Sequence, residues 1–341
     1  MKILDPTITE GWDAEIAALP GASFFHGAAW ATVLKQSYGF KPVYFTKAEG
    51  CLSAAIPLME VDSFLTGKRA VSLPFTDYCE PLVPHVEVSK VLFEAIVHEG
   101  RKRQWKYIEL RGGADFLGDG PASAWFYRHA LDLTPGEAKL FRSLRDSTRR
   151  NIKKAVKEGV EVRFESTPDA LREFYRLNCL TRREHGLPPQ PWQFFEHLHE
   201  EILARGMGAV ALAYFRGNAI AANVYLHTGG AVIYKYGASD KAHQNLRANN
   251  VVMWEAVKLY AARGFKSLCF GRTEPENEGL RQFKTGWGAE ESIINYYRYD
   301  LAAGAFVTGP KGVSARAHQV FSRLPVPALK AIGGMLYRHM G

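Results

Sequence analysis

Residues 208–238, "GAVALAYFRGNAIAANVYLHTGGAVIYKYGA", decide the fold class of this chain. Three largely apolar segments are separated by Arg216-Gly217-Asn218 and by Gly229-Gly230. Short connections of this composition join antiparallel strands. The stretch therefore predicts an antiparallel meander of three strands. A long helix ending at Gly264 and the buried strand "KSLCFG" (266–271) are predicted to follow it.

The segments around this meander complete an α/β unit whose order occurs twice. Two helices are predicted at 171–186 and 191–206, then a short helix at 279–288 and a last strand at 292–300. The first half repeats this order with a helix at 28–39, a hairpin turning at Glu49-Gly50, a helix at 88–103 and a strand at 106–110. "GCLSAAIPL" (50–58) also aligns with "NAIAANVYL" (218–226). A duplicated unit is predicted; the alternative is two unrelated α+β domains of similar order.

A basic segment joins the two halves. "LRDSTRRNIKKAVKEGVEV" (144–162) predicts an amphipathic helix that ends at Gly159, with Arg149, Lys153 and Lys157 in one stripe. Either this stripe is a solvated helix face, or it contacts an anion such as a diphosphate or a tRNA acceptor stem.

Composition favours a cytoplasmic protein with an anionic partner. The net charge is +8 and the pI is about 9.2, which suits RNA, a phosphorylated metabolite or an acidic membrane surface. No signal-peptide or membrane-spanning pattern occurs. The four scattered cysteines are predicted to be core thiols, and no metal site is expected. Neither a G-x-S-x-G nor a P-loop motif is present, which argues against a hydrolase or an ATPase.

Five motifs occur in an order that resembles a known family: "STRRNIK" (147–153), "REHGLP" (183–188), "YKYGAS" (234–239), "GR" (271–272) and "FKTGWG" (283–288). With the element order, they make residues 20–300 similar to the FemABX and FemAB-like (BioF2-like) acyltransferases. The resemblance implies an α/β fold with mixed sheets, built as two tandem GCN5-related N-acetyltransferase (GNAT-like) domains. It implies an acceptor-side domain at 1–143, a basic connecting helix at 144–160 and a donor-side domain at 161–300. A basic amphipathic tail would occupy 301–341.

The resemblance also implies catalytic residues. It places Phe283 and Lys284 in the donor channel, where the lysine would donate to a developing oxyanion or a substrate carbonyl. Strand alternation predicts Tyr234 and Tyr236 on one face. Tyr236 is the preferred catalytic tyrosine, because it is nearer the strand end; core packing is the alternative for both.

Phosphate binding is predicted where the long helix begins. In CoA-dependent members of the fold this turn reads Q/R-x-x-G-x-G/A, and helix amides bind the pyrophosphate there. Gln244 opens the pattern, but Arg247 and Asn249 replace the glycines. Arg247 is therefore a candidate for direct phosphate binding. The remaining predicted substrate-binding residues are Tyr234, Asn249, Arg272, Arg183, Lys35, Arg149 and Lys153.

The predicted function is transfer of an aminoacyl or acyl group to an amine of a cell-envelope precursor or polysaccharide. The donor would be aminoacyl-tRNA or an acyl-CoA, with no tightly bound cofactor, and the acceptor an anionic nucleotide- or lipid-linked molecule. One alternative is a CoA-dependent N-acetyltransferase with a small-molecule amine. Another is a non-catalytic protein that binds RNA or a membrane surface. The tail either contacts the inner membrane peripherally or packs on the first domain.

Overall fold

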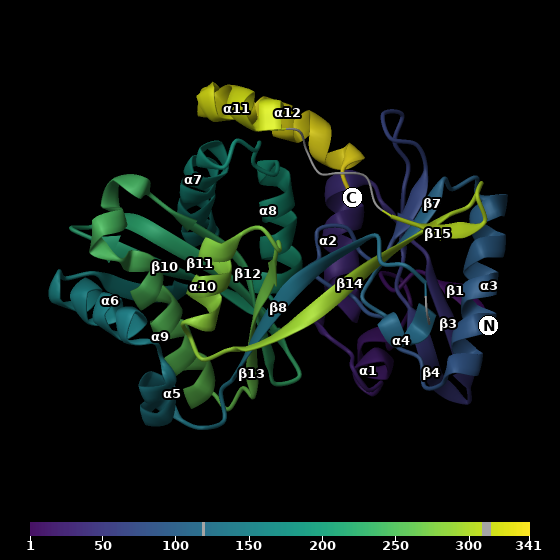
Figure 1. The fold of residues 1–341 in the computed structure, drawn as a ribbon, viewed down its shortest axis with the longest axis horizontal. Coiled ribbons are helices and arrows are strands. Elements are labelled where there is room, and N and C mark those ends of the chain that lie inside the picture. Colours follow the sequence, from purple (N-terminus) through teal and green to yellow (C-terminus); the bar gives the residue numbers. More distant parts are fainter. Residues whose placement is uncertain (118–119, 309–314) are drawn as a thin grey trace. The chain divides into compact units, whose positions relative to one another are not determined.

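The computed structural model describes residues 1–117, 120–308 and 315–341, which form two compact units. Unit 1 consists of Met1–Phe126, Ile293–Gly312 and Met335–Gly341, and unit 2 of Tyr127–Ser292 and Val313–Gly334. The chain enters unit 2 within strand β8 (Ala124–Asp132) and leaves it within β14 (Glu290–Asp300) (Figure 1). These divisions differ from the predicted boundaries at 143/144 and 300/301, because β14 pairs with a strand of unit 1 and β8 with a strand of unit 2.

Unit 1 contains two sheets and its own core. β1 (Lys2–Leu4), β3 (Tyr44–Glu49) and β4 (Cys51–Ile56) form the smaller sheet. The other has the order β2 (Lys41–Pro42), β5 (Met59–Val61), β6 (Arg69–Val71), β7 (Tyr107–Arg111) and β14, with β15 (Ala305–Val307) paired to β14. The helices are α1 (Trp12–Ala17), α2 (Ala28–Tyr38), α3 (Val86–Lys102) and α4 (Ala114–Leu117), with short 3-10 turns at Phe24–His26 and Tyr337–His339. The predicted hairpin, helices and strand of this half are confirmed.

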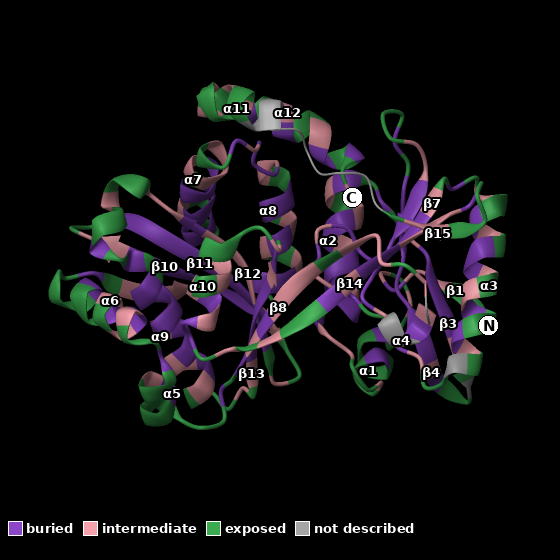
Figure 2. Ribbon diagram, in the orientation of Figure 1, coloured by how far each residue is buried: buried purple, intermediate pink, exposed green. Residues whose placement is uncertain are grey.

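Unit 2 is a mixed sheet between helices. Its strand order is β8, β13 (Ser267–Thr273), β12 (Ala231–Ser239), β11 (Asn218–Thr228), β10 (Gly208–Phe215) and β9 (Glu161–Glu165). The helices are α5 (Glu137–Ser143), α6 (Asp146–Lys157), α7 (Pro168–Glu184), α8 (Trp192–Leu198), α9 (Ala248–Ala262) and α10 (Glu278–Thr285), with a π-helical turn η2 (His199–Leu203) and a 3-10 turn η3 (Lys241–Leu246). The predicted meander is confirmed as β10–β11–β12. Figure 2 shows these strands and α9 largely buried and α6 largely exposed.

A β-bulge at Lys235 corrects one prediction about the tyrosines. Val224 pairs with Tyr236 and Tyr225 with Tyr234, so β12 has one extra residue at this point. Tyr234 packs on Tyr225 in the core beneath α9, whereas Tyr236 lies among phenylalanines of α7 and α8. The two tyrosines therefore do not share a face, because the bulge breaks the alternation on which that prediction relied.

The C-terminal tail packs on unit 2 before its last residues join unit 1. It forms α11 (Ala315–Arg323) and α12 (Val326–Leu336). Leu329 is fully buried and the ammonium of Lys330 lies 4.9 Å from the centre of the Tyr175 ring. His339 belongs to unit 1, where its Nδ1 is 3.1 Å from the hydroxyl oxygen of Ser63.

Three observations bear on the composition arguments. Cys79, Cys179 and Cys269 are buried thiols as predicted, but Cys51 is exposed, because it lies at the hairpin turn of β3 and β4. Within the described ranges, no group of three or more His, Cys, Asp or Glu side chains is arranged to hold a metal ion. None of the helices in that part of the chain combines the length and apolar character needed to cross a bilayer.

Candidate functional site

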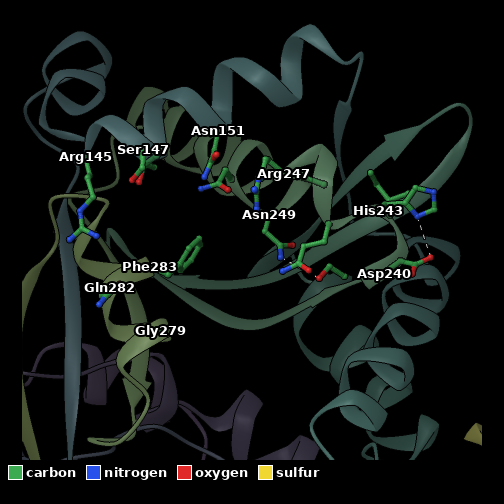
Figure 3. A pocket seen from close by; sticks show the side chains of 16 residues that line it. Arg145, Ser147, Asn151, Asp240, His243, Arg247, Asn249, Gly279, Gln282 and Phe283 are labelled. Atoms are coloured by element: carbon green, nitrogen blue, oxygen red, sulfur yellow. Dashed lines mark hydrogen bonds and ion pairs between the residues drawn. The ribbon is translucent and has the colours of Figure 1, made fainter.

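A cavity of about 350 Å³ lies in unit 2 at the start of α9, and we call it the α9 cavity. Its walls come from the first turns of α6, the end of β12, the turn η3, the first turn of α9 and the helix α10 (Figure 3). The lining residues are Arg145, Ser147, Thr148, Asn151, Ile220, Ser239, Asp240, His243, Gln244, Arg247, Ala248, Asn249, Asn250, Gly279, Gln282 and Phe283. The lining is mainly polar, which suits a hydrogen-bonding ligand.

The α9 cavity contains the N-terminal end of a 15-residue helix. The first backbone N–H groups of a helix lack partners within the helix, and the helix dipole adds partial positive charge there. Arg247, the residue before α9, has φ 59° and ψ 31°. Glycine adopts this left-handed conformation readily, whereas an ordinary residue is destabilised in it by about 1–2 kcal/mol. Arg247 thus adopts a backbone conformation that favours glycine and adds a guanidinium at the start of α9.

Charged and amide side chains surround this helix end. Asn249 Nδ2 donates to the hydroxyl oxygen of Ser239 at 3.2 Å. His243 Nδ1 lies 3.3 Å from a carboxylate oxygen of Asp240, and both side chains appear in Figure 3. Arg145 provides a second guanidinium at the opposite wall (Figure 3), where its backbone N–H donates to the carbonyl of Gly286 at 3.0 Å. With two arginines, one aspartate and a helix N-terminus, the cavity favours an anionic group.

Phe283 and Lys284 are adjacent in sequence but point to different surroundings. Phe283 lines the α9 cavity and contacts Trp287 edge-on, with ring centres 6.0 Å apart. Lys284 is only 2% exposed and is not a lining residue. Its Nζ donates to the carbonyl oxygens of Gly271 at 3.1 Å and Arg272 at 2.8 Å. Lys284 therefore joins α10 to the end of β13.

A polar network lies near Lys284. Burial, and then the positive charge of Lys284, lower the pKa of His129. His129 Nε2 is 3.0 Å from a carboxylate oxygen of Glu291, which also accepts two hydrogen bonds from Arg281 at 2.6 and 2.7 Å. The Arg281 hydrogen bonds more than offset desolvation and lower the pKa of Glu291. Glu291 is therefore held as a carboxylate between the side chains of Arg281 and His129.

Neither predicted tyrosine lines the α9 cavity. Tyr234 lies in the core, and burial raises its pKa to about 12. Its hydroxyl occupies the place where a side chain on Gly237 would begin. Tyr236 packs between α7 and α8, with ring centres 5.9 Å from Phe195. In this part of the sheet β12 pairs with β13 through 231–233 and 267–269. Tyr234 and Tyr236 therefore lie just beyond the residues of β12 that pair with β13.

The other predicted cations are dispersed. Arg149 does not line the α9 cavity. Its side chain forms an ion pair with Asp146 and donates a hydrogen bond to the carbonyl oxygen of Arg142 at 3.1 Å. Lys153 is exposed one turn further along α6. Lys35 belongs to unit 1, where its ammonium is 2.7 Å from the Asp5 carboxylate. Arg183 is half-buried in the last turn of α7. Arg272 belongs to β13, and its Nε lies 3.8 Å from a carboxylate oxygen of Glu274.

The structure thus brings together Arg247, Asn249 and Phe283 among the predicted site residues. Arg145 and Asn151 were missed, although both lie in the basic segment. The helical pattern emphasised the charged stripe further along α6, while the cavity uses the first turns of this helix. The available signal was the polar cluster Arg145–Asn151 at a helix start, where anions bind.

Comparisons with known proteins bear on the fold of this chain. Residues 142–287 match the family described as Acetyltransferase (GNAT) domain. No curated protein matches the sequence significantly.

Three solved structures share the fold at low sequence identity. FemX superposes with a TM-score of 0.67 and 13% identity, covering 86% of this chain and 97% of FemX. L-PGS from Bacillus licheniformis gives a TM-score of 0.55 at 11% identity, covering 95% of this chain and 100% of L-PGS. A tandem GNAT protein from the clavulanic acid biosynthesis pathway gives 0.54 at 12%, covering 89% of this chain and 93% of that protein.

These similarities confirm the predicted tandem GNAT-type α/β fold, and the α9 cavity lies within the matched segment. Residues 142–287 match a GNAT acetyltransferase domain, which identifies an acyltransferase, and the chain has a fold similar to that of FemX.

Proposed function

We propose that this acyltransferase moves an aminoacyl or acyl group from a phosphate-bearing carrier to an amine of a cell-envelope precursor or polysaccharide. The carrier is aminoacyl-tRNA or an acyl-CoA. One observation carries the proposal: the α9 cavity combines a helix N-terminus with Arg145 and Arg247 on opposite walls. The similarity to FemX and to L-PGS supports aminoacyl transfer, and the GNAT match supports a CoA donor.

The carrier phosphate would bind at the start of α9. The backbone N–H groups of the first turn and the Arg247 guanidinium would donate to its oxygens, and Arg145 would bind from the other wall. Each hydrogen bond to a charged group contributes about 1.5–3 kcal/mol. That is roughly ten- to a hundredfold in Kd.

The acyl group would extend along β12 past Phe283. Beyond Ile233 the described pairing of β12 with β13 ends, which leaves an edge of the strand for a bound carbonyl. Attack by the acceptor amine forms a C–N bond and breaks the bond from the acyl carbon to the carrier sulfur or oxygen. The amine proton passes to the leaving carrier or to water. Lys284 would act from behind by holding the carbonyls of Gly271 and Arg272 in place.

A binding experiment tests the carrier site. We expect CoA or an aminoacylated tRNA acceptor minihelix to raise the melting temperature, and the responding ligand identifies the donor class. Arg145→Ala and Arg247→Ala should each weaken its binding at least tenfold. Arg216→Ala is the matched control, because Arg216 is an exposed arginine with φ 50° in the same unit but outside the cavity. Equal affinities for the Arg145, Arg247 and Arg216 variants would refute the site, as would no response to any carrier.

A further inference from the structure

A second hollow in unit 2 shares no lining residue with the α9 cavity. It lies between α5, α6 and α9, has a volume of about 940 Å³, and we call it the α5–α6–α9 groove. Figure 1 shows these three helices together in unit 2. Ligand sites typically have volumes of about 300–1,000 Å³. The groove is therefore large enough for a ligand of its own.

The floor of the groove is apolar. Phe141 and Trp254 contact each other with ring centres 5.1 Å apart, and Ile152 packs beside them in the same core cluster. Val156 on the rim is 58% exposed, although it sits in a helix whose other exposed residues are mostly charged. Val156 therefore extends the apolar floor of the groove to the surface, inside a rim of polar residues.

The rim of the groove is cationic. Arg142, Lys153 and Lys157 line it, and in the ranges 1–117, 120–308 and 315–341 their side chains form no ion pair. Lys258 also lines it but is paired with Glu255 at 2.9 Å. Glu137 is the one remaining acidic lining residue. An apolar floor with excess positive charge on its rim complements an amphiphile that has an anionic head.

The length of the groove distinguishes between two kinds of occupant. Its lining spans 137–142 on α5, 152–157 on α6 and 254–258 on α9. At 1.5 Å per residue these walls are about 6–8 Å long. A bound amphipathic helix presents anchors at i, i+4 and i+7, which span about 10 Å. The groove is too short for those anchors and fits part of one aliphatic chain.

We propose that the α5–α6–α9 groove binds an acyl chain of an anionic phospholipid, with the headgroup phosphate on Lys153, Lys157 and Arg142. This site is independent of the proposed carrier site. In this proposal Lys153 and Lys157 of α6 bind the phospholipid headgroup, and unit 2 lies against an anionic membrane surface.

Sedimentation with vesicles tests the proposal on the full-length protein. We expect binding to vesicles of phosphatidylglycerol in phosphatidylcholine and none to pure phosphatidylcholine. K153E/K157E should weaken binding at least tenfold. R150E/K154E changes the same charges on the same helix, but these exposed residues line neither the groove nor the α9 cavity. The vesicle affinity of R150E/K154E should stay within about twofold of the wild-type affinity. We expect this at 150 mM salt, where the Debye length is about 8 Å and long-range attraction is screened.

A second pair of variants tests the apolar contact. Val156→Ser should weaken vesicle binding several-fold. Val320→Ser is the control, because Val320 is also 58% exposed on a helix of unit 2 but lies in α11. Melting temperatures of all variants verify folding. Absence of binding, equal losses from the two charge-reversed pairs, or a loss with Val320→Ser but not Val156→Ser would each overturn the proposal.

Discussion

The ammonium nitrogen of Lys284 lies 2.8 Å from the carbonyl oxygen of Arg272, in a side chain that is 2% exposed. The neighbouring Phe283 instead lines the α9 cavity. We therefore expect Lys284→Met to lower the free energy of unfolding by about 1–3 kcal/mol, because buried carbonyls lose their donor. Transfer turnover should fall at least tenfold at temperatures where the variant is folded. Denaturant titration and single-turnover rates check both effects, with the exposed Lys241→Met as control; full turnover in the variant would remove Lys284 from the mechanism.

Arg247 should show opposite effects on stability and on binding. Arg247→Gly relieves a left-handed backbone conformation, so we expect the free energy of unfolding to rise by as much as about 1 kcal/mol. The same change should weaken carrier binding at least tenfold, because the guanidinium is lost. Arg216→Gly, also at positive φ, should gain stability without losing affinity. Thermal denaturation and titration with the carrier measure the two quantities, and tighter binding by Arg247→Gly would contradict the role of the side chain.

The Tyr234 hydroxyl leaves no room for a side chain at position 237, which is glycine. A Cβ added at Gly237 would overlap the phenol oxygen of Tyr234. We expect Gly237→Ala to destabilise the protein by about 1–3 kcal/mol through overpacking. Adding Tyr234→Phe should recover part of that loss, because the clashing oxygen is gone. A double-mutant cycle of unfolding free energies measures this coupling, and strictly additive effects would show that the two residues do not touch.

The neutral form of His26 should make stability depend on pH. The side chain is buried, and burial lowers its pKa to about 4. Its Nε2 donates to the carbonyl of Glu80 at 2.8 Å, while Nδ1 accepts from the backbone N–H of Ser23 at 3.0 Å. Protonation of Nδ1 would replace this acceptor with an N–H group that faces the N–H of Ser23, so the hydrogen bond would be lost.

In the unfolded chain His26 has an ordinary pKa of about 6.5. The unfolded state therefore binds the proton first as the pH falls. Stability is fully present above pH 6.5 and decreases down to about pH 4, by about 3 kcal/mol in total. Urea titrations between pH 7 and 4 measure this slope, which His26→Gln should reduce. An unchanged slope in the variant would assign the pH dependence to other groups.

Two adjacent glycines test how the tail packs. A Cβ on Gly333 would overlap the backbone carbonyl oxygen of Pro189, whereas one on Gly334 meets no atom within 4 Å. We expect Gly333→Ala to loosen α12 from unit 2 and speed proteolysis within the tail. Gly334→Ala should stabilise the helix by up to about 1 kcal/mol. Equal protease sensitivity of the two variants would contradict the packing of α12 against Pro189.

Much of the fold follows from local sequence patterns. The largely apolar segments and the Gly-containing turns between them predict β10–β11–β12, and the apolar run ending at Gly264 predicts α9. These signals are local because a strand or helix repeats every two or 3.6 residues along its own segment. The candidate site was predicted only in part. Arg247 and Asn249 were recognisable because they occupy glycine positions next to a helix start.

Long-range contacts decided what the sequence left open. The bulge at Lys235 separates Tyr234 from Tyr236, β14 pairs within unit 1, and Lys284 turns inward to β13. The α9 cavity also combines segments that are far apart in the sequence, since its lining extends from Arg145 to Phe283. By itself the sequence determined the elements and their order, since these depend on neighbours along the chain. Register, side-chain direction and the composition of the cavity depend on partners distant in sequence, so only the tertiary structure decided them.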